Sequence, residues 1–244
     1  MDTTFSQTYR IGISQVDTTR KLKLSALEAM FMETGSFHCE QAGLGIEDTK
    51  RMGITWVITK MRMEINRLPK VWETVTVETW PLEKGKITFD RDYVLMSENN
   101  EVLVRATSRW CLINEKTRTP VPKVMVKHTQ PNAFAVPQFD SAFLVVEPVE
   151  NKGKQHNILY SDLDFNQHIT NTKYFDIALD TLKKDEIEGL DIGAVQMNFV
   201  AEAPYDSKLF VAKKQTKNQL IFCGRNQNND VVFSLLMILK PKID

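Results

Sequence analysis

Few cysteines, glycines and prolines occur in this sequence of 244 residues, and it has no long apolar run. The three cysteines, Cys39, Cys111 and Cys223, lie far apart and form no Cys-x-x-Cys pair, which argues against a disulfide framework or a structural zinc site. Ten glycines and nine prolines are too few for a low-complexity chain. We expect a folded protein with reduced, mostly buried thiols and no metal ligands.

An excess of charge is also missing, because 31 basic residues balance 31 acidic ones. The chain therefore lacks the broad positive field that non-specific binding of nucleic acids or anionic membranes requires. The longest apolar run, residues 231–239, is far shorter than the roughly 20 residues of a membrane-spanning helix. Asp2 stands where a signal peptide would carry positive charge. These absences predict no nucleic-acid partner, no membrane span and a cytoplasmic location.

Apolar periodicity divides the first half of the chain into one helix and several strands. Leu24, Leu27, Met30 and Phe31 recur at helical spacing, which predicts a helix over roughly residues 25–42. Side chains further along alternate between apolar and polar, which is typical of strands. The predicted strands lie at residues 56–65, 73–80, 86–96 and 102–113.

The second half repeats this order after residues 114–141, a stretch with four prolines and little periodicity that indicates a linker. A helix is predicted from Tyr174 to Leu182, where apolar residues return to helical spacing. The predicted strands lie at residues 143–149, 193–201, 207–216, 219–226 and 230–240.

An offset between the two halves supports an internal duplication. Adding 147 to each position of the first apolar stripe reproduces the second, so that Leu27, Met30 and Phe31 correspond to Tyr174, Ile177 and Ala178. We therefore predict an α+β fold of two tandem units, residues 1–130 and 131–244, each a long helix wrapped by an antiparallel sheet.

The densest polar segment, residues 160–171, leads directly into the second predicted helix. A helix N-terminus offers unpaired N–H groups to an oxygen that gains negative charge, and Asn166 and His168 can add side-chain donors. Asp and Asn are also common turn formers and helix caps, so Asp164 or Asn171 alone would indicate little. The combination Asp-x-Asn-x-His-x-x-Asn within eight residues points to function.

Glu202 is a second candidate, because it is the single carboxylate at the end of a mostly apolar predicted strand. A glutamate in this position is most often only solvated. If the strand lies against the N-terminus of the second helix, however, Glu202 faces His168 and Asn166, and the pair could activate water.

The first half provides an internal control for this interpretation. Its corresponding loop, residues 16–21, contains no histidine. An offset of 135, which aligns Pro69 with Pro204, places Arg67 at the position of Glu202. Only the second half is therefore expected to carry the catalytic groups.

With Asp164-Phe165-Asn166-Gln167-His168, followed by Asn171, Tyr174 and Glu202, the sequence resembles the acyl-acyl carrier protein thioesterases. First-half motifs extend the resemblance across nearly the whole chain: Trp56-Val57-Ile58, Arg67-Leu68-Pro69 with Trp72, Glu78-Thr79-Trp80-Pro81 and Arg109-Trp110. The resemblance implies two fused hot-dog units and hydrolysis of the thioester between a fatty acyl chain and acyl carrier protein, which ends chain elongation in fatty acid biosynthesis. It implies no metal and no organic cofactor.

The resemblance also assigns roles, with Asp164, Asn166, His168 and Glu202 in the catalytic positions. Plant relatives often carry a cysteine directly after the glutamate, whereas Ala203 here excludes a thiol nucleophile at that position. The implied mechanism is attack by water, with Glu202 preferred over His168 as the base. Asn166 and the helix N-terminus would donate to the oxyanion, and Asp164 would orient the loop.

The family places the acyl chain beneath the helix of the first half, which makes Asn171, Met30, Phe31, Trp56 and Ile58 candidate substrate-binding residues. The apolar four are equally explained as core. Acyl carrier protein, the expected partner, is acidic and calls for a basic docking patch. Its candidate residues are Lys60, Arg62, Lys70, Lys173, Lys183 and Lys184.

Three alternatives stay open at this stage. A coenzyme A thioesterase shares the hot-dog unit, and a non-catalytic acyl-binding or sensor protein would use the same cavity without Asn166, His168 and Glu202. A double hot-dog hydratase fits the spacing less well. The sequence leaves open the acyl length and whether two chains form a homodimer.

Overall fold

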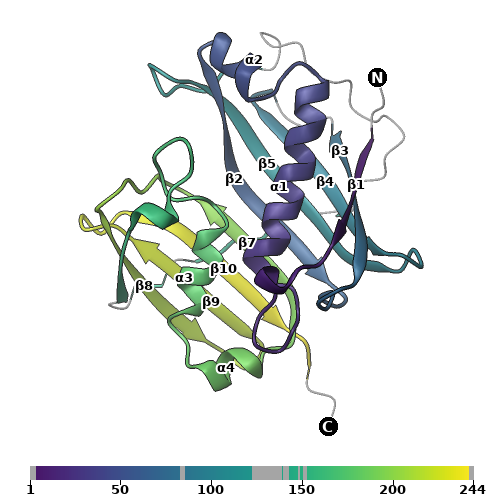
Figure 1. Ribbon diagram of the computed structural model, residues 1–244. Helices are drawn as coiled ribbons and strands as arrows, with labels where there is room; N and C mark the ends of the chain where they lie inside the picture. The colour runs from purple at the N-terminus through teal and green to yellow at the C-terminus, as the bar shows by residue number, and fades with distance from the viewer. Residues whose placement is uncertain are drawn as a thin grey trace.

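A computed structural model describes residues 4–82, 86–122, 139, 143–147, 149–150 and 153–241. This part of the chain forms one antiparallel sheet of ten strands in the order β1-β3-β4-β5-β2-β7-β10-β9-β8-β6. Helix α1 lies across the strands of the first half, and the shorter α3 lies across those of the second (Figure 1). Among the described residues, none of the helices is long and apolar enough to cross a membrane.

The elements of the first half are β1 (Phe5–Arg10), a 3-10 turn (Ile13–Gln15), α1 (Leu24–Gln41), α2 (Ile46–Arg51), β2 (Ile54–Ile65), β3 (Thr74–Leu82), β4 (Thr88–Ser97) and β5 (Val102–Asn114). The predicted helix and four strands are confirmed. Strand β1 was not predicted, because only Phe5 and Tyr9 in it are apolar and the segment is short.

The elements of the second half are β6 (Lys154–Asn157), a 3-10 turn (Tyr160–Asp162), α3 (Lys173–Leu179), α4 (Lys184–Glu188), β7 (Ile192–Phe199), β8 (Lys208–Gln215), β9 (Gln219–Arg225) and β10 (Val231–Leu239). The last four strands agree with the sequence prediction. The predicted helix is confirmed, although it ends at Leu179 instead of Leu182.

The strand predicted at residues 143–149 is wrong for the residues described there, which have no strand conformation. The reason is a contact with a residue distant in sequence, because a side chain of β7 makes the backbone hydrogen bonds that a neighbouring strand would make. The amide of Gln196 accepts from the Leu144 N–H at 2.6 Å and donates to the Leu144 carbonyl at 2.8 Å. The edge position in the sheet is occupied by β6 instead.

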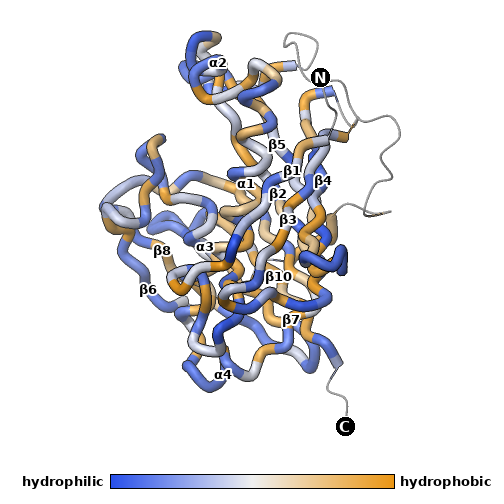
Figure 2. Tube along the Cα trace, turned by 45° about the vertical axis from the view of Figure 1, so that its right-hand side comes forward, coloured by the Kyte–Doolittle hydropathy of each residue, from blue (hydrophilic) through white to orange (hydrophobic). Residues whose placement is uncertain are grey.

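The two halves meet where β2 pairs with β7, with Lys60 opposite Asn198 and Met61 opposite Met197. A single hydrophobic cluster continues from one half to the other through this junction. Figure 2 shows hydrophobic stretches along the central strands and a mostly hydrophilic α4. Each half is thus a helix packed on its own group of five strands, as expected of tandem hot-dog units, and the predicted boundary at residue 130 lies outside the described residues.

The duplication extends to the hydrogen bonds of the loop before each helix. The N–H of Asp17 donates to the carbonyl of Lys21 at 2.8 Å, and the N–H of Asp164 donates to the carbonyl of His168 at the same distance. These residues are related by the predicted offset of 147. The same loop is therefore built twice, once in each half.

For the segments after β2 and β7, the offset that relates the two halves differs by one residue from the predicted 135. The N–H of Leu22 donates to the carbonyl of Pro69 at 2.8 Å, and the N–H of Ile169 donates to that of Ala203 at 3.1 Å. Pro69 and Ala203 are 134 residues apart, so the predicted offset of 135 is wrong. The error arose because two prolines were aligned by residue type.

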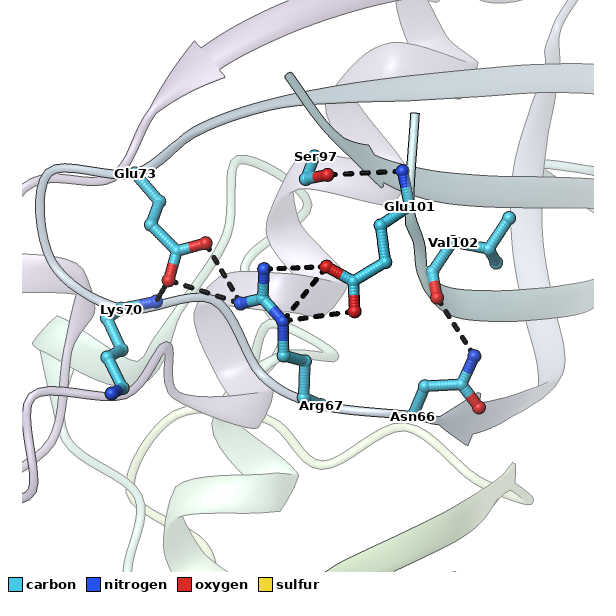
Figure 3. Close-up of polar contacts among 7 residues, drawn as sticks. All are labelled: Asn66, Arg67, Lys70, Glu73, Ser97, Glu101 and Val102. Atoms are coloured by element: carbon cyan, nitrogen blue, oxygen red, sulfur yellow. Dashed lines mark hydrogen bonds and ion pairs between the residues drawn. The ribbon is translucent and has the colours of Figure 1, made fainter. Parts of the chain in front are cut away.

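With the corrected offset of 134, Leu68 of the first half corresponds to Glu202 of the second, and Arg67 does not. The Arg67 guanidinium instead lies between two carboxylates, with Nη1 2.9 Å from Glu73 Oε2 and Nη2 3.0 Å from Glu101 Oε2 (Figure 3). Arg67 therefore ties the end of β2 to the start of β3 and to the turn before β5.

We expect Arg67→Ala to lower the free energy of unfolding by about 1–2 kcal/mol, because both of its partly exposed carboxylate partners lose their counter-ion. Urea denaturation measures this. Arg51→Ala is the matched control, since the Arg51 side chain is 75% exposed and pairs with Asp48 on the same helix. An equal effect of the two substitutions would contradict the structural role of Arg67.

Glu28 in α1 is completely buried, and neither of its carboxyl oxygens has a hydrogen-bond partner in the described structure. Burial raises the pKa of Glu28 from an ordinary 4.5 to about 8. Between these values the folded state keeps a proton that the unfolded state releases, so the free energy of unfolding falls as pH rises. In this range the free energy of unfolding falls by up to about 1.4 kcal/mol per pH unit.

Glu28→Gln should remove this dependence, because an amide does not titrate. Urea denaturation of both proteins at pH 6, 7 and 8 gives the comparison. The variant is expected to gain stability relative to the wild type as pH rises. A difference that stays constant over this range would contradict a protonated Glu28.

Candidate active site

The loop before α3 is shaped by Asp164, whose carboxylate binds the backbone that follows it. Oδ1 of Asp164 accepts from the N–H of Asn166 at 2.8 Å and from the N–H of His168 at 3.4 Å. This is the local turn that aspartate favours. Asp164 thus fixes the backbone on which the other two predicted catalytic side chains stand.

The loop is joined to the segment after β7 by a short antiparallel bridge between His168 and Pro204. This bridge brings Glu202 beside the histidine, with His168 Nε2 3.5 Å from Glu202 Oε2. Both side chains remain partly open to solvent, at 33% and 42% exposure respectively. The expected proximity of the two groups is thus present in the folded chain.

Arg118 completes this group and was not predicted from the sequence. Its guanidinium donates to Oε1 of Glu202, the oxygen that faces away from His168. Arg118 belongs to the turn after β5 in the first half of the chain. No local signal indicates the contact, because 84 residues separate the two partners.

These side chains open onto a cavity of about 950 Å³ whose walls come from both halves. The second half contributes the loop before α3 and the segment after β7, and the first half contributes residues of α1, α2 and β2. The predicted residues that line the cavity are Asp164, Asn166, His168, Glu202, Asn171, Trp56 and Ile58. The structure therefore brings seven of the nine proposed site residues to one space.

Met30 and Phe31, the other two, lie in the hydrophobic core at 1% and 0% exposure and do not line this cavity. The residues of α1 in the wall are Met32 and Ser36, one turn apart. Met30 and Phe31 belong to the helix face that packs on the sheet, whereas the neighbouring face borders the cavity. The apolar periodicity identified which residues of α1 are buried, but it did not distinguish residues of the hydrophobic core from residues that line the cavity.

Tyr174, at the start of α3, closes the inner side of the site. Its ring packs on Phe233 at 4.8 Å and on Phe199 at 6.0 Å between centroids. Burial raises the pKa of the Tyr174 hydroxyl, and the charges of Glu202 and Asp164 raise it further. Tyr174 is therefore a protonated phenol at neutral pH.

Asp162 anchors the loop from behind. It accepts from the Leu159 N–H at 3.0 Å, contacts His156 Nε2 at 3.2 Å and lies 3.6 Å from Lys173 Nζ. Burial raises the pKa of Asp162, but these three partners outweigh burial, and the pKa is lowered overall. The carboxylate is therefore charged when the loop is folded.

Three of the expected oxyanion donors at the N-terminus of α3 are already engaged, which corrects the prediction for those three. The N–H groups of residues 173, 174 and 175 donate to the carbonyls of residues 170, 171 and 172 at 3.0, 3.2 and 3.3 Å. A turn precedes the helix and takes its first donors. The amide of Asn166, which lines the cavity, is the donor that the loop itself presents.

Cysteine chemistry has no place at this site. Cys223 is fully buried and Cys111 is half-buried, and burial raises the pKa of both thiols. Neither lines the cavity. Within the described residues, no group of three or more histidine, cysteine, aspartate or glutamate side chains is placed to hold a metal ion.

The residues predicted for a basic docking patch are partly occupied by other contacts. Lys60 lies over the ring of Phe143 at 5.5 Å, and Arg62 lies over that of Phe139 at 4.7 Å. Lys173 binds the Asp162 carboxylate described above. These three cations therefore already have partners within the chain, and a docking role for the six stays a prediction.

Comparison with known families gives two adjoining matches. Residues 2–127 match the acyl-ACP thioesterase N-terminal domain, and residues 147–234 match the acyl-ACP thioesterase C-terminal domain. A chloroplastic acyl-[acyl-carrier-protein] hydrolase from Cuphea viscosissima is 30% identical over 225 residues, which is 84% of this chain and 53% of the relative. A chloroplastic palmitoyl-acyl carrier protein thioesterase from Gossypium hirsutum is 31% identical over 220 residues, again 84% and 53%. The chain spans about half the length of these curated relatives.

Two solved structures share the fold over nearly their full lengths. An acyl-ACP thioesterase from Bacteroides thetaiotaomicron superposes with a TM-score of 0.85 at 20% identity, covering 98% of each chain. The 12:0-ACP thioesterase from Umbellularia californica superposes with a TM-score of 0.83 at 21% identity, covering 99% of each chain. At this identity the likeness establishes the fold, and it confirms the predicted architecture of two tandem hot-dog units.

Proposed function

Because this chain belongs to the acyl-ACP thioesterase family, we propose that it hydrolyses fatty acyl thioesters of acyl carrier protein to free fatty acid and the carrier thiol. The observation that carries the proposal is the meeting of Glu202, His168 and Asn166 at one cavity with an apolar wall. A carboxylate and an imidazole 3.5 Å apart can hold and deprotonate a water molecule. The apolar wall formed by Trp56 and Ile58 suits an acyl chain.

In the proposed mechanism, water attacks the thioester carbonyl carbon directly. Glu202 accepts the proton of this water, and His168 orients it from the other side. The tetrahedral intermediate then collapses, the carbon–sulfur bond breaks, and the thiolate leaves with the bonding electron pair. A thiol has a pKa near 8.5, so its departure needs little help from an acid.

Asn166 is proposed to stabilise the oxyanion through its side-chain amide. A well-placed donor of this kind contributes roughly 3–4 kcal/mol to transition-state stabilisation. Asp164 acts indirectly, since it holds the backbone of Asn166 and accepts from the Asn166 Nδ2 at 3.5 Å. Asn171 and the apolar wall are proposed to bind substrate.

The biological setting is likewise a proposal. The products place the reaction at the end of fatty acid synthesis, with acyl carrier protein as the partner. The proposal keeps the predicted division, in which residues 1–130 supply the acyl pocket and residues 131–244 supply the catalytic groups. A cytoplasmic location stays a prediction, whereas the named plant relatives are chloroplastic.

The proposal is tested by measuring thiol release from acyl carrier protein thioesters of increasing acyl length. We expect turnover to peak at one length, and His168→Ala and Glu202→Ala each to lower kcat by about 10²–10⁴-fold. Glu98→Ala, an exposed glutamate in the turn after β4, is the control and should behave as the wild type.

Two other results would redirect the assignment. Faster hydrolysis of the coenzyme A thioester at equal acyl length would identify an acyl-CoA thioesterase. Tight binding of acyl carrier protein thioesters without thiol release would identify an acyl-binding protein.

The cavity wall gives a second prediction. Ile58→Ala should shift the preferred acyl chain to a greater length, because the side chain is 3% exposed and borders the cavity. Ile65→Ala is the matched control, since Ile65 is equally buried on the same strand but does not line the cavity.

Both variants should lose about 2–5 kcal/mol of stability, as large-to-small core substitutions do. Only Ile58→Ala is expected to alter the length profile. The same shift in both variants would argue that general loosening, and not the cavity wall, sets acyl length.

A further inference from the structure

The carboxylate of Glu202 is shared between two partners, one on each oxygen. Arg118 Nη2 donates to Oε1, while His168 Nε2 lies 3.5 Å from Oε2. The terminal torsion of a glutamate side chain is broad, so a part-exposed carboxylate turns freely unless a second group holds it. Resting on the proposed hydrolysis, we infer that Arg118 is a positioning residue that orients Glu202 so that Oε2 faces His168 and the attacking water.

Hydrogen bonds within the turn fix the backbone that carries Arg118. The Asn114 side chain accepts from the N–H groups of Lys116 and Thr117, both at 3.0 Å. The Arg118 N–H donates to the Asn114 carbonyl at 2.9 Å, and the Asn114 N–H donates to the Thr119 carbonyl at 2.9 Å. The guanidinium therefore approaches Glu202 from a fixed backbone, as precise positioning requires.

Arg118 brings a positive charge to a cavity wall that also carries two carboxylates, Asp164 and Glu202. Asp164 and Glu202 are two carboxylates close enough to the Tyr174 hydroxyl for both to raise its pKa. His168 carries a positive charge only when protonated, whereas an arginine is always charged. Arg118 thus balances the carboxylate pair without depending on the protonation of His168.

The contact between Arg118 and Glu202 also shows what the first half contributes close to the proposed reaction. At the position of His168 the first half has Lys21, and at the position of Glu202 it has Leu68. The first half therefore repeats the loop without its catalytic groups. Through Arg118 it nevertheless completes the site of the second half.

The experiment compares Arg118→Ala, Arg118→Lys and the wild type in the thiol-release assay. Because the inferred role is to orient the base, Arg118→Ala should lower kcat by about 10–100-fold, within the range of general base catalysis, and change KM by less than about threefold. Arg118→Lys should recover part of kcat, because the charge returns without the planar fork. Lys116→Ala is the control, since Lys116 is exposed in the same turn and does not line the cavity.

A double-mutant cycle with Glu202→Gln separates positioning from direct action on substrate. If Arg118 acts through Glu202, adding Arg118→Ala to Glu202→Gln causes no further loss of kcat. Losses that multiply, an unchanged kcat in Arg118→Ala, or a rise in KM alone would overturn the inference. Thermal unfolding of each variant shows whether the fold is kept.

The ion pair has a readout that does not need turnover. The ¹⁵N NMR signals of the Arg118 guanidinium should move in Glu202→Gln and stay in place in the control variant Glu98→Ala. If the wild type hydrolyses the thioester but the Arg118 signals do not move in Glu202→Gln, the inference is overturned. If the Arg118 signals differ between the wild type and Glu202→Gln but the wild type releases no thiol, the proposed hydrolysis is refuted and the Arg118–Glu202 contact is kept.

Discussion

The pairing of β2 with β7 determines how the two halves of this protein are placed. Lys60 to Glu64 lie opposite Ala194 to Asn198, so the sheet continues without a break across the duplication. Each strand then leads to one side of the cavity, since β2 begins at its apolar wall and β7 is followed by the segment that carries Glu202. A site that depends on both halves needs this junction, because no other strand pair joins the two groups of strands in the described chain.

The duplicated loop separates what the fold requires from what catalysis requires. Asp17 and Asp164 make the same turn in the two halves, so an aspartate at this position is a fold-forming residue first. The halves differ in the side chains that the turn presents, with Lys21 in one loop and His168 in the other. The proposed chemistry therefore depends on side chains that only the second copy of this loop carries.

Much of the architecture could be predicted because it depends on local periodicity. The helix at Leu24–Gln41 and the long strands each show a pattern of apolar residues that only one secondary structure can bury. Errors appeared where a partner distant in sequence decided the outcome. Leu144, for example, bonds to the side chain of Gln196 on β7. The correction at α3 has a local cause instead, because the turn before the helix binds the first N–H groups of α3.

The sequence by itself determined the duplicated α+β fold, the family, and the proximity of the loop residues Asp164, Asn166 and His168, because all three follow from patterns within short segments. Tertiary structure alone decided which face of α1 borders the cavity. It also decided which residue of the first half corresponds to Glu202, and that Arg118 binds Glu202. These outcomes depend on how strands far apart in the chain align in one sheet, and no local sequence pattern encodes that alignment.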